Sequence, residues 1–162
     1  MAAKSQSVMD NLRRIVQAAR QSSAQCERLA GLTAAQLLVL KSIHANPGLS
    51  INDLAALTLT HQASVSEVVI RLEGRGLLIR ERSSEDARRR ELQLTAAGEN
   101  ALTRQVETIQ ETLIAAMDRL PPEVLDQLCD GLDRLIEEAG FAHEAPSMLF
   151  EDGEGDPVEA AP

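Results

Sequence analysis

The chain has 162 residues and a net charge of −9, and its residues are 44% hydrophobic, yet only two are aromatic, Phe141 and Phe150. This length suits one domain with helical extensions, and the aliphatic composition favours helices packed on helices. Residues 1–14 lack the apolar stretch of a signal peptide, and no apolar run approaches the ~20 residues of a membrane span. We therefore expect a cytoplasmic protein with no membrane attachment.

The first two expected helices follow from periodicity and capping. Apolar and small residues recur at steps of three and four through residues 8–30, which predicts an amphipathic helix that ends at Gly31. Thr33 and Gln36 have the spacing of a capping box at the start of the next helix. Because residues 37–43 form a nearly continuous apolar run, we expect that second helix to be buried.

A helix-turn-helix is predicted next. Ser50 and Asp53 have capping-box spacing at the start of a short helix, and residues 58–60 turn the chain into a fourth helix from about His61 to Gly74. The buried face of this helix is predicted to consist of Val65, Val68, Val69 and Leu72. The residues predicted to point outward are Ala63, Ser64, Ser66, Glu67, Ile70 and Arg71.

An arginine-rich hairpin follows the helix-turn-helix. Residues 78–82 and 91–95 alternate apolar and polar side chains, as paired strands do. The window from Arg71 to Arg90 contains seven arginines and four acidic residues, so it is cationic on a chain that is acidic overall. This contrast indicates a polyanionic partner, and DNA is the obvious one because phosphate neutralisation supplies most of the sequence-independent binding energy. The alternative is a merely solvated charged hairpin.

The remaining helices predict self-association. Thr95 is expected to open one long amphipathic helix of about 25 residues, which Pro121 ends. A final helix, with Pro122 in its first turn and leucines at steps of three and four, runs to Gly140. A small winged domain cannot cover three long amphipathic helices, so we expect them to bury one another across the twofold axis of a homodimer. An intramolecular helical bundle is the alternative.

These elements give a mainly α fold with a small β-hairpin wing (α+β) and four segments. The segments are a dimerisation helix in residues 1–31, a winged helix-turn-helix domain in 32–95, dimerisation helices in 96–140 and an acidic tail in 141–162. The tail contains no Lys or Arg, and we expect it to be flexible. A sharper hypothesis is that Met148, Leu149 and Phe150 dock on the dimerisation helices while the following acids compete with DNA.

Three segments, SVSEVVIRLEGRGLLIRE, EDARRRELQLTAAGE and LTAAQLLVL, together resemble the MarR family of bacterial winged-helix repressors. The resemblance covers about residues 8–140, and its most specific part is the hairpin spacing of Asp86, Arg88, Leu94 and Thr95. It implies a homodimer on a pseudo-palindromic operator in double-stranded DNA, and hence association with the nucleoid. Recognition helices would enter major grooves ~10 base pairs apart and the wings would reach minor grooves. It also implies that a small, often phenolic, effector binds between the dimerisation helices and the winged domain and releases the DNA.

The residues expected to contact DNA lie on the fourth helix and the hairpin. Arg88 is expected to enter the minor groove, and Asp86 to orient the hairpin by pairing with a neighbouring arginine. Glu67 either accepts from a cytosine amine or pairs with Arg71 one turn on. The other expected contacts to base edges or phosphates come from His61, Gln62, Ser64, Ser66, Arg71, Arg75, Arg89 and Arg90.

Two alternative functions stay open, a thiol-based redox-sensing repressor and a winged-helix module that binds acidic protein. One branch of the family senses hydroperoxides through cysteines in its first and final helices, which makes Cys26 and Cys129 redox candidates. However, Cys26 lies late in its helix, and the chain has no tyrosine to activate a thiolate. Both cysteines fall on or beside apolar stripes, where buried inert thiols are usual.

Other chemistry is not indicated. His44 lies where it can edge the effector crevice that the family resemblance implies. His44, His61 and His143 lack metal-ligand spacing, so we expect no metal and no cofactor. Because the chain also lacks a phosphate-binding loop and a nucleophile with its base, we do not expect an enzyme.

Overall fold

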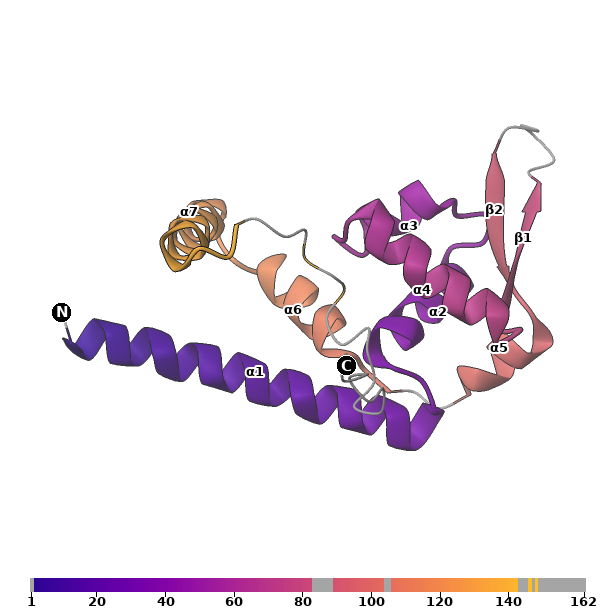
Figure 1. Cartoon of the computed structure of the whole chain (residues 1–162), viewed down its shortest axis with the longest axis horizontal. Coiled ribbons are helices and arrows are strands. Elements are labelled where there is room, and N and C mark those ends of the chain that lie inside the picture. Colours follow the sequence, from indigo (N-terminus) through magenta and orange to yellow (C-terminus); the bar gives the residue numbers. More distant parts are fainter. Residues whose placement is uncertain (1, 83–88, 104–105, 143–145, 147, 149–162) are drawn as a thin grey trace, which may run out of the picture.

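The computed structural model describes residues 2–82, 89–103, 106–142, 146 and 148 (Figure 1). The predicted fold class is confirmed: helices dominate, and one two-stranded antiparallel hairpin accompanies them. In chain order the elements are α1 (Ala2–Ala30), α2 (Ala34–Ala45), α3 (Ile51–Leu57), α4 (Gln62–Gly74), β1 (Leu78–Arg82), β2 (Arg90–Leu94), α5 (Ala96–Ala101), α6 (Ile109–Met117) and α7 (Pro122–Ala139).

Helices α2, α3 and α4 and the hairpin form one lobe around an aliphatic core. Both predicted capping boxes are present, at Thr33 with Gln36 and at Ser50 with Asp53, so each helix starts where local hydrogen bonding predicts. The turn between α3 and α4 includes Leu59, whose φ of 51° is unusual for a residue with a Cβ. The core of the lobe contains the α2 run, the predicted face of α4, one leucine of α3 and two of the hairpin. These residues are Leu37, Leu38, Val39, Leu40, Ile43, Leu54, Val65, Val68, Val69, Leu72, Leu78 and Leu92.

Met148 of the C-terminal segment joins this core. The sequence predicts that this residue docks on the dimerisation helices, and it is only 3% exposed. It lines a small cavity with residues of α6, which include Leu113 and Ile114. The other two residues of that prediction, Leu149 and Phe150, lie outside the described residues.

The hairpin is anchored at its base and projects from the lobe (Figure 1). Its register pairs Leu78 with Leu94 at the base and Arg82 with Arg90 at the far end. The Leu92 amide donates to the Leu49 carbonyl at 2.8 Å, which ties β2 to the segment before α3. The side chains of Leu78 and Leu92 are buried, whereas Arg82 and Arg90 are exposed. The lobe therefore holds the hairpin by its apolar end and leaves its cationic end in solvent.

The prediction of one long helix after Thr95 is wrong, because the chain forms two separate helices there, α5 and α6. Thr108 and Glu111 make a capping box that starts α6. The Ile109 amide donates to Ser22 Oγ of α1 at 2.9 Å. The Val106 carbonyl, which a continuous helix would bond internally, instead accepts from Lys41 Nζ at 3.1 Å. These bonds replace the hydrogen bonds that a continuous helix would make across the break.

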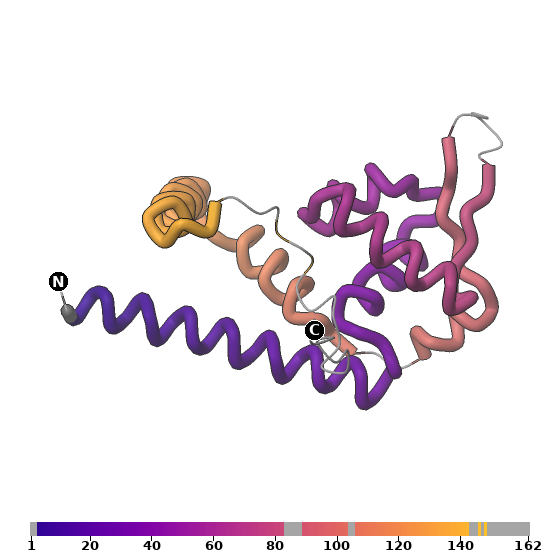
Figure 2. The backbone as a smooth tube through the Cα atoms, in the orientation of Figure 1, coloured from indigo at the N-terminus to yellow at the C-terminus, as the bar shows by residue number. Residues whose placement is uncertain are grey.

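Helices α1, α6 and α7 extend away from the winged lobe, and Figure 2 shows α7 and the N-terminal end of α1 on the side opposite the hairpin. Only part of the predicted α1 stripe is covered: Ser23 and Cys26 are buried, whereas Val8 and Ile15 are exposed. None of the residues of α7 is buried. The structure therefore does not show the alternative of an intramolecular bundle. Within the described part of the chain, no helix combines the length and apolar character needed to cross a membrane.

Candidate nucleic-acid interface

Helix α4 presents a polar outer face beside the hairpin. His61, Gln62, Glu67 and Arg71 are exposed and Ser66 is partly exposed, in agreement with the helical wheel. His61 is the N-cap residue, and its side chain makes no capping hydrogen bond. The first turn of α4 also contains no acidic residue that would offset the positive end of the helix dipole. The amides at the start of α4, with the positive end of its dipole, are therefore suited to an anionic ligand such as a phosphate.

The predicted outward position of Ser64 is wrong. Its exposed fraction is 8%, and its Oγ donates to the Pro146 carbonyl at 3.2 Å. A helical wheel places Ser64 at the edge of the buried face, and contact with Pro146 then covers that edge. Since Pro146 lies 82 residues away in the sequence, no local pattern could show this.

Arg75 connects the end of α4 to the start of α2. Its Nη1 donates to Gln36 Oε1 at 2.8 Å, and its Nη2 donates to the Gly31 carbonyl at 3.0 Å. The guanidinium thus fixes the C-terminal end of α4 to the junction between α1 and α2. The sequence assigned Arg75 to phosphate contact, and the structure adds this positioning role.

Arg89 is also held by the protein. Its Nη2 lies 2.7 Å from Asp53 Oδ2 and 3.3 Å from the Gly48 carbonyl, which joins the hairpin to α3. The side chain and amide of Ser50 donate to the Asp53 carboxylate, and these bonds, with the charge of Arg89, lower the pKa of Asp53. The sequence pattern indicates Asp53 only as a capping residue, because its arginine partner is 36 residues away.

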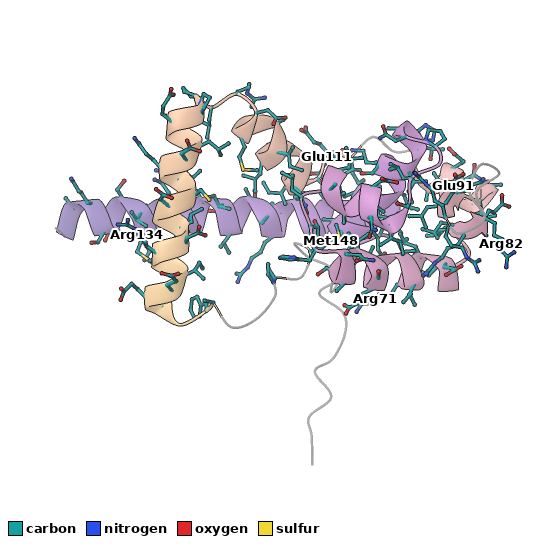
Figure 3. The ribbon with its side chains drawn as sticks, turned by 90° about the horizontal axis from the view of Figure 1, so that it is seen from above. Arg71, Arg82, Glu91, Glu111, Arg134 and Met148 are labelled. Carbon is teal, nitrogen blue, oxygen red and sulfur yellow. The ribbon has the colours of Figure 1, made fainter. Side chains whose placement is uncertain are left out.

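The described arginines of the hairpin fall into two groups. Arg80 and Arg89 pair with acids of the lobe, Arg80 Nε lying 3.1 Å from Glu73 Oε2. Arg82 and Arg90 are exposed and face each other across the strands. Figure 3 shows Arg71 and Arg82 in the half of the molecule that carries α4 and the hairpin, far from Arg134 on α7. Asp86 and Arg88, assigned to hairpin orientation and minor-groove insertion, lie outside the described residues.

A cavity of about 840 Å³ lies between α2, α6 and the end of α3. His44 lines it, as the resemblance led us to expect, and its Nδ1 lies 2.8 Å from Glu99 Oε2. Sequence reasoning missed the charged pair in the cavity wall, Lys41 Nζ with Glu111 Oε1 at 2.6 Å, whose members are 70 residues apart. The remaining walls are largely apolar and include Leu38, Leu57, Leu102, Val106 and Ile114.

Neither cysteine is an activated thiol. Cys26 is buried in α1, and burial raises its pKa. Cys129 is exposed on α7, which corrects the expectation that it is a buried thiol, and the negative charge of Asp133 raises its pKa. Peroxide sensing requires a thiolate, so both environments disfavour the redox-sensing alternative.

Asp133→Asn is expected to accelerate alkylation of Cys129 at neutral pH by about twofold to fivefold, because removing the adjacent carboxylate increases the thiolate fraction. The rate is measured with iodoacetamide and mass spectrometry. Glu137→Gln, on the same helix but outside the group of carboxylates that act on Cys129, is the matched control and should leave the rate unchanged. Equal rates for Asp133→Asn and the wild-type chain would contradict this account.

Within the described ranges, no three His, Cys, Asp or Glu side chains come together as ligands for a metal ion.

Comparisons with known proteins agree with this architecture. Residues 30–89 match the sequence model of the MarR family. Transcriptional regulator HosA of Escherichia coli is 31% identical over 103 residues, which is 62% of this chain and 76% of HosA. The crystal structure of MarR matches with a TM-score of 0.50 and 27% identity, over 82% of this chain and 96% of MarR. The Staphylococcus aureus MepR–DNA complex, at 21% identity, shares the fold with a TM-score of 0.53, over 79% of this chain and 94% of MepR.

Proposed function

This chain belongs to the MarR family of transcription regulators, and from that premise we propose that it binds double-stranded DNA as a homodimer, through α4 and the hairpin β1–β2. The observation that carries the proposal is the polar outer face of α4 beside an arginine-bearing hairpin, on a chain whose net charge is −9. Positive charge gathered on the hairpin of an anionic protein attracts a polyanion to that surface. The solved complex of MepR with DNA supports the same use of the shared fold.

The proposed contacts divide by role. Gln62 and Ser66 on the exposed face of α4 are suited to base edges, whereas Arg71 and the amides at the start of α4 are suited to phosphates. Glu67 keeps its two proposed roles, as acceptor from a cytosine amine or partner of Arg71. Arg90, with the exposed Arg82 opposite it, supplies the positive charge at the far end of the described hairpin. The remaining proposed contacts are those of His61, Arg88 and Arg89.

The proposed dimer follows from apolar surface that one chain leaves exposed. Along α7, Leu125, Leu128, Leu132 and Leu135 share one face and are all partly in solvent, as are Val8 and Ile15 of α1. Contiguous apolar faces of this kind mark association surfaces. A twofold arrangement would cover them and set the two copies of α4 about one helical turn of DNA apart. In this proposal, residues 32–95 read DNA, and residues 1–31 and 96–140 join the subunits.

We further propose that the chain is a repressor whose effector occupies the cavity between α2 and α6. Apolar walls and the Lys41 ammonium suit a small molecule with a ring and an acidic or phenolic group. Glu111 belongs both to the Lys41 ion pair and to the Thr108 cap that begins α6. An anionic ligand that competes for Lys41 would therefore act on the position of α6, and through it on the spacing of the two DNA-binding lobes.

The test is duplex binding measured by fluorescence anisotropy, with fragments from the intergenic region beside the gene. A DNA-binding regulator is expected to prefer one palindromic fragment by at least about 10³-fold over unrelated duplex, and its affinity should fall steeply with salt. A winged-helix module for acidic protein would bind every duplex weakly and equally. That second result would remove the proposal.

Arg71→Ala is expected to weaken binding to specific and unrelated duplexes alike, by about fivefold to tenfold, and to lower the salt slope by about one. A phosphate contact carries no sequence information, so the preference among fragments should persist. The control is Arg134→Ala, which removes an exposed arginine of α7 that lies far from Arg71 (Figure 3). If Arg71→Ala changed the preference among DNA fragments but left the salt dependence of affinity unchanged, Arg71 would be assigned to a base contact.

A further inference from the structure

The two faces of the hairpin carry opposite charges at the far end of its described strands. Residues directly opposite each other on paired strands point to the same face, and successive residues along one strand point to opposite faces. The register places Arg82 opposite Arg90 and Glu81 opposite Glu91. The arginine pair, Arg82 and Arg90, therefore lies on one face, and the glutamate pair, Glu81 and Glu91, lies on the other. In Figure 3 Arg82 and Glu91 lie at the end of the molecule that carries the hairpin.

The arginine pair is on the face that looks toward the winged lobe. Leu92 is two residues from Arg90, so it shares that face, and it is buried in the core of the lobe. A cavity of about 510 Å³ lies between this face, α3 and α4. Arg90 thus borders the space beside α4, whereas the glutamate pair points away from it. The cavity is lined by Ile51, Ile70, Glu73, Arg80, Arg90 and Leu92.

The charges of the arginine pair are not compensated by the described part of the chain. Arg80, in the same cavity wall, is paired with Glu73 at 3.1 Å. No described acidic side chain forms such an ion pair with Arg82 or Arg90, and both are exposed. Like charges directly opposite each other destabilise paired strands. An anion between the two guanidinium groups would remove that cost.

The spacing of the arginine pair suits one phosphate group. Side chains directly opposite each other have Cβ atoms about 4.5–5.5 Å apart, and each guanidinium presents a planar fork of N–H donors that matches phosphate oxygens. The register does not depend on the arginines, because Leu78 pairs with Leu94 at the base and the Leu92 amide donates to the Leu49 carbonyl at 2.8 Å. The two guanidinium groups are therefore held on one face before any ligand binds.

We propose that Arg82 and Arg90 together hold one phosphate of the DNA backbone beside α4, and that the glutamate pair keeps the opposite face of the hairpin off the duplex. This rests on the proposed DNA-binding function and adds to it which face of the hairpin meets DNA. Arginines alone would attract a backbone to either face. Carboxylates on the outer face repel phosphates, so they select one orientation of the hairpin by making the other unfavourable.

The decisive variant exchanges the two faces by the substitutions E81R, R82E, R90E and E91R in one chain. It keeps the composition, the net charge and the like-charge pairs, and it leaves the apolar base of the hairpin intact. At about 100 mM salt it should bind the preferred fragment at least about tenfold more weakly than the wild-type chain, because carboxylates then face the backbone. Circular dichroism and thermal unfolding check its folding. Equal affinities would show that DNA does not distinguish the faces and would overturn the proposal.

A second variant, R82Q with R90Q, introduces no new charge and counts the phosphates. Its slope of log affinity against log salt should fall by about 0.9 for each lobe that contacts DNA, the value for one phosphate. An unchanged slope, or a fall of twice that size from two separate phosphates, would overturn the shared contact. The matched control is R119Q with R134Q, which neutralises two exposed arginines, one just before α7 and one within it, on the side opposite the hairpin (Figure 1). It should leave the slope unchanged.

The outcomes separate the two proposals. Equal binding by the wild-type chain and the face-exchanged variant, with preference for one fragment retained, would overturn the face assignment and leave the DNA-binding function standing. Absence of duplex binding by the wild-type chain would overturn the function and the face assignment with it.

Discussion

Gly98→Ala is expected to lower the free energy of unfolding by about 3 kcal/mol, because an added Cβ is more crowded there than at any other described glycine. A Cβ at Gly98 would lie 2.0 Å from the Leu77 carbonyl oxygen and 3.1 Å from its carbon. Both are backbone atoms, so no side-chain rotation can relieve the overlap. Chemical denaturation at fixed protein concentration measures the change.

The close approach of Gly98 to Leu77 joins α5 to the base of the hairpin. The Thr95 amide donates to the same Leu77 carbonyl at 3.1 Å, and Thr95 Oγ1 donates to the Gly76 carbonyl at 2.7 Å. Thr95 Oγ1 also accepts from the Gly98 amide and so caps α5. A shift of α5 to admit a methyl group would break these bonds, so the hairpin should become more susceptible to proteolysis.

Gly74→Ala is the control for Gly98→Ala. Gly74 is the last residue of α4, and a Cβ there would meet no atom within 4 Å. Alanine favours helix over glycine, so stability should stay equal or rise by up to about 1 kcal/mol. Similar losses for both variants would show that the α5–hairpin contact is looser than the structure indicates.

The second large effect is expected from Leu128→Glu combined with Leu132→Glu on α7. These leucines are 44% and 43% exposed in the single chain and lie on one face of the helix. If that face is the subunit interface, burying two carboxylates there costs several kcal/mol, and the dimer should dissociate. Light scattering should then report the mass of one chain, 17.5 kDa.

Loss of the dimer should weaken operator binding far more than loss of any one DNA contact. Two lobes joined in one dimer bind two half-sites with avidity that can exceed either single affinity by about 10²–10⁴-fold. We expect the double variant to lose at least about 100-fold of its operator affinity while its unfolding transition stays cooperative. None of the residues of α7 is buried within the chain. Substitutions on this helix can therefore disrupt the dimer without unfolding the single chain.

The control variant carries the same change in charge on another face of α7. Gln127→Glu with Arg134→Gln lowers the net charge by the same amount, and Figure 3 shows Arg134 on the flank of α7. This control should stay dimeric and bind the operator as the wild-type chain does. A wild-type mass of one chain at micromolar concentration would contradict the proposed dimer outright.

Local sequence determined the starts of helices and the buried face of α4. Thr33 with Gln36, and Ser50 with Asp53, satisfy each other's amides across three residues, so their capping boxes form whatever surrounds them. The valines of α4 recur at helical spacing, and their burial follows from that pattern alone. The arginine-rich hairpin and the helix-turn-helix before it likewise indicated the family through short-range features.

The tertiary structure decided everything that depends on residues distant in sequence. The break between α5 and α6 rests on bonds to Ser22 and Lys41, the burial of Ser64 on Pro146, and the position of Arg89 on Asp53. Each pair joins elements that meet only when the lobe has folded, and periodicity within a single helix holds no information about them. The sequence therefore determined most of the elements and the position of the arginine-rich hairpin, and packing decided where the helix after Thr95 breaks and which side chains are free to bind.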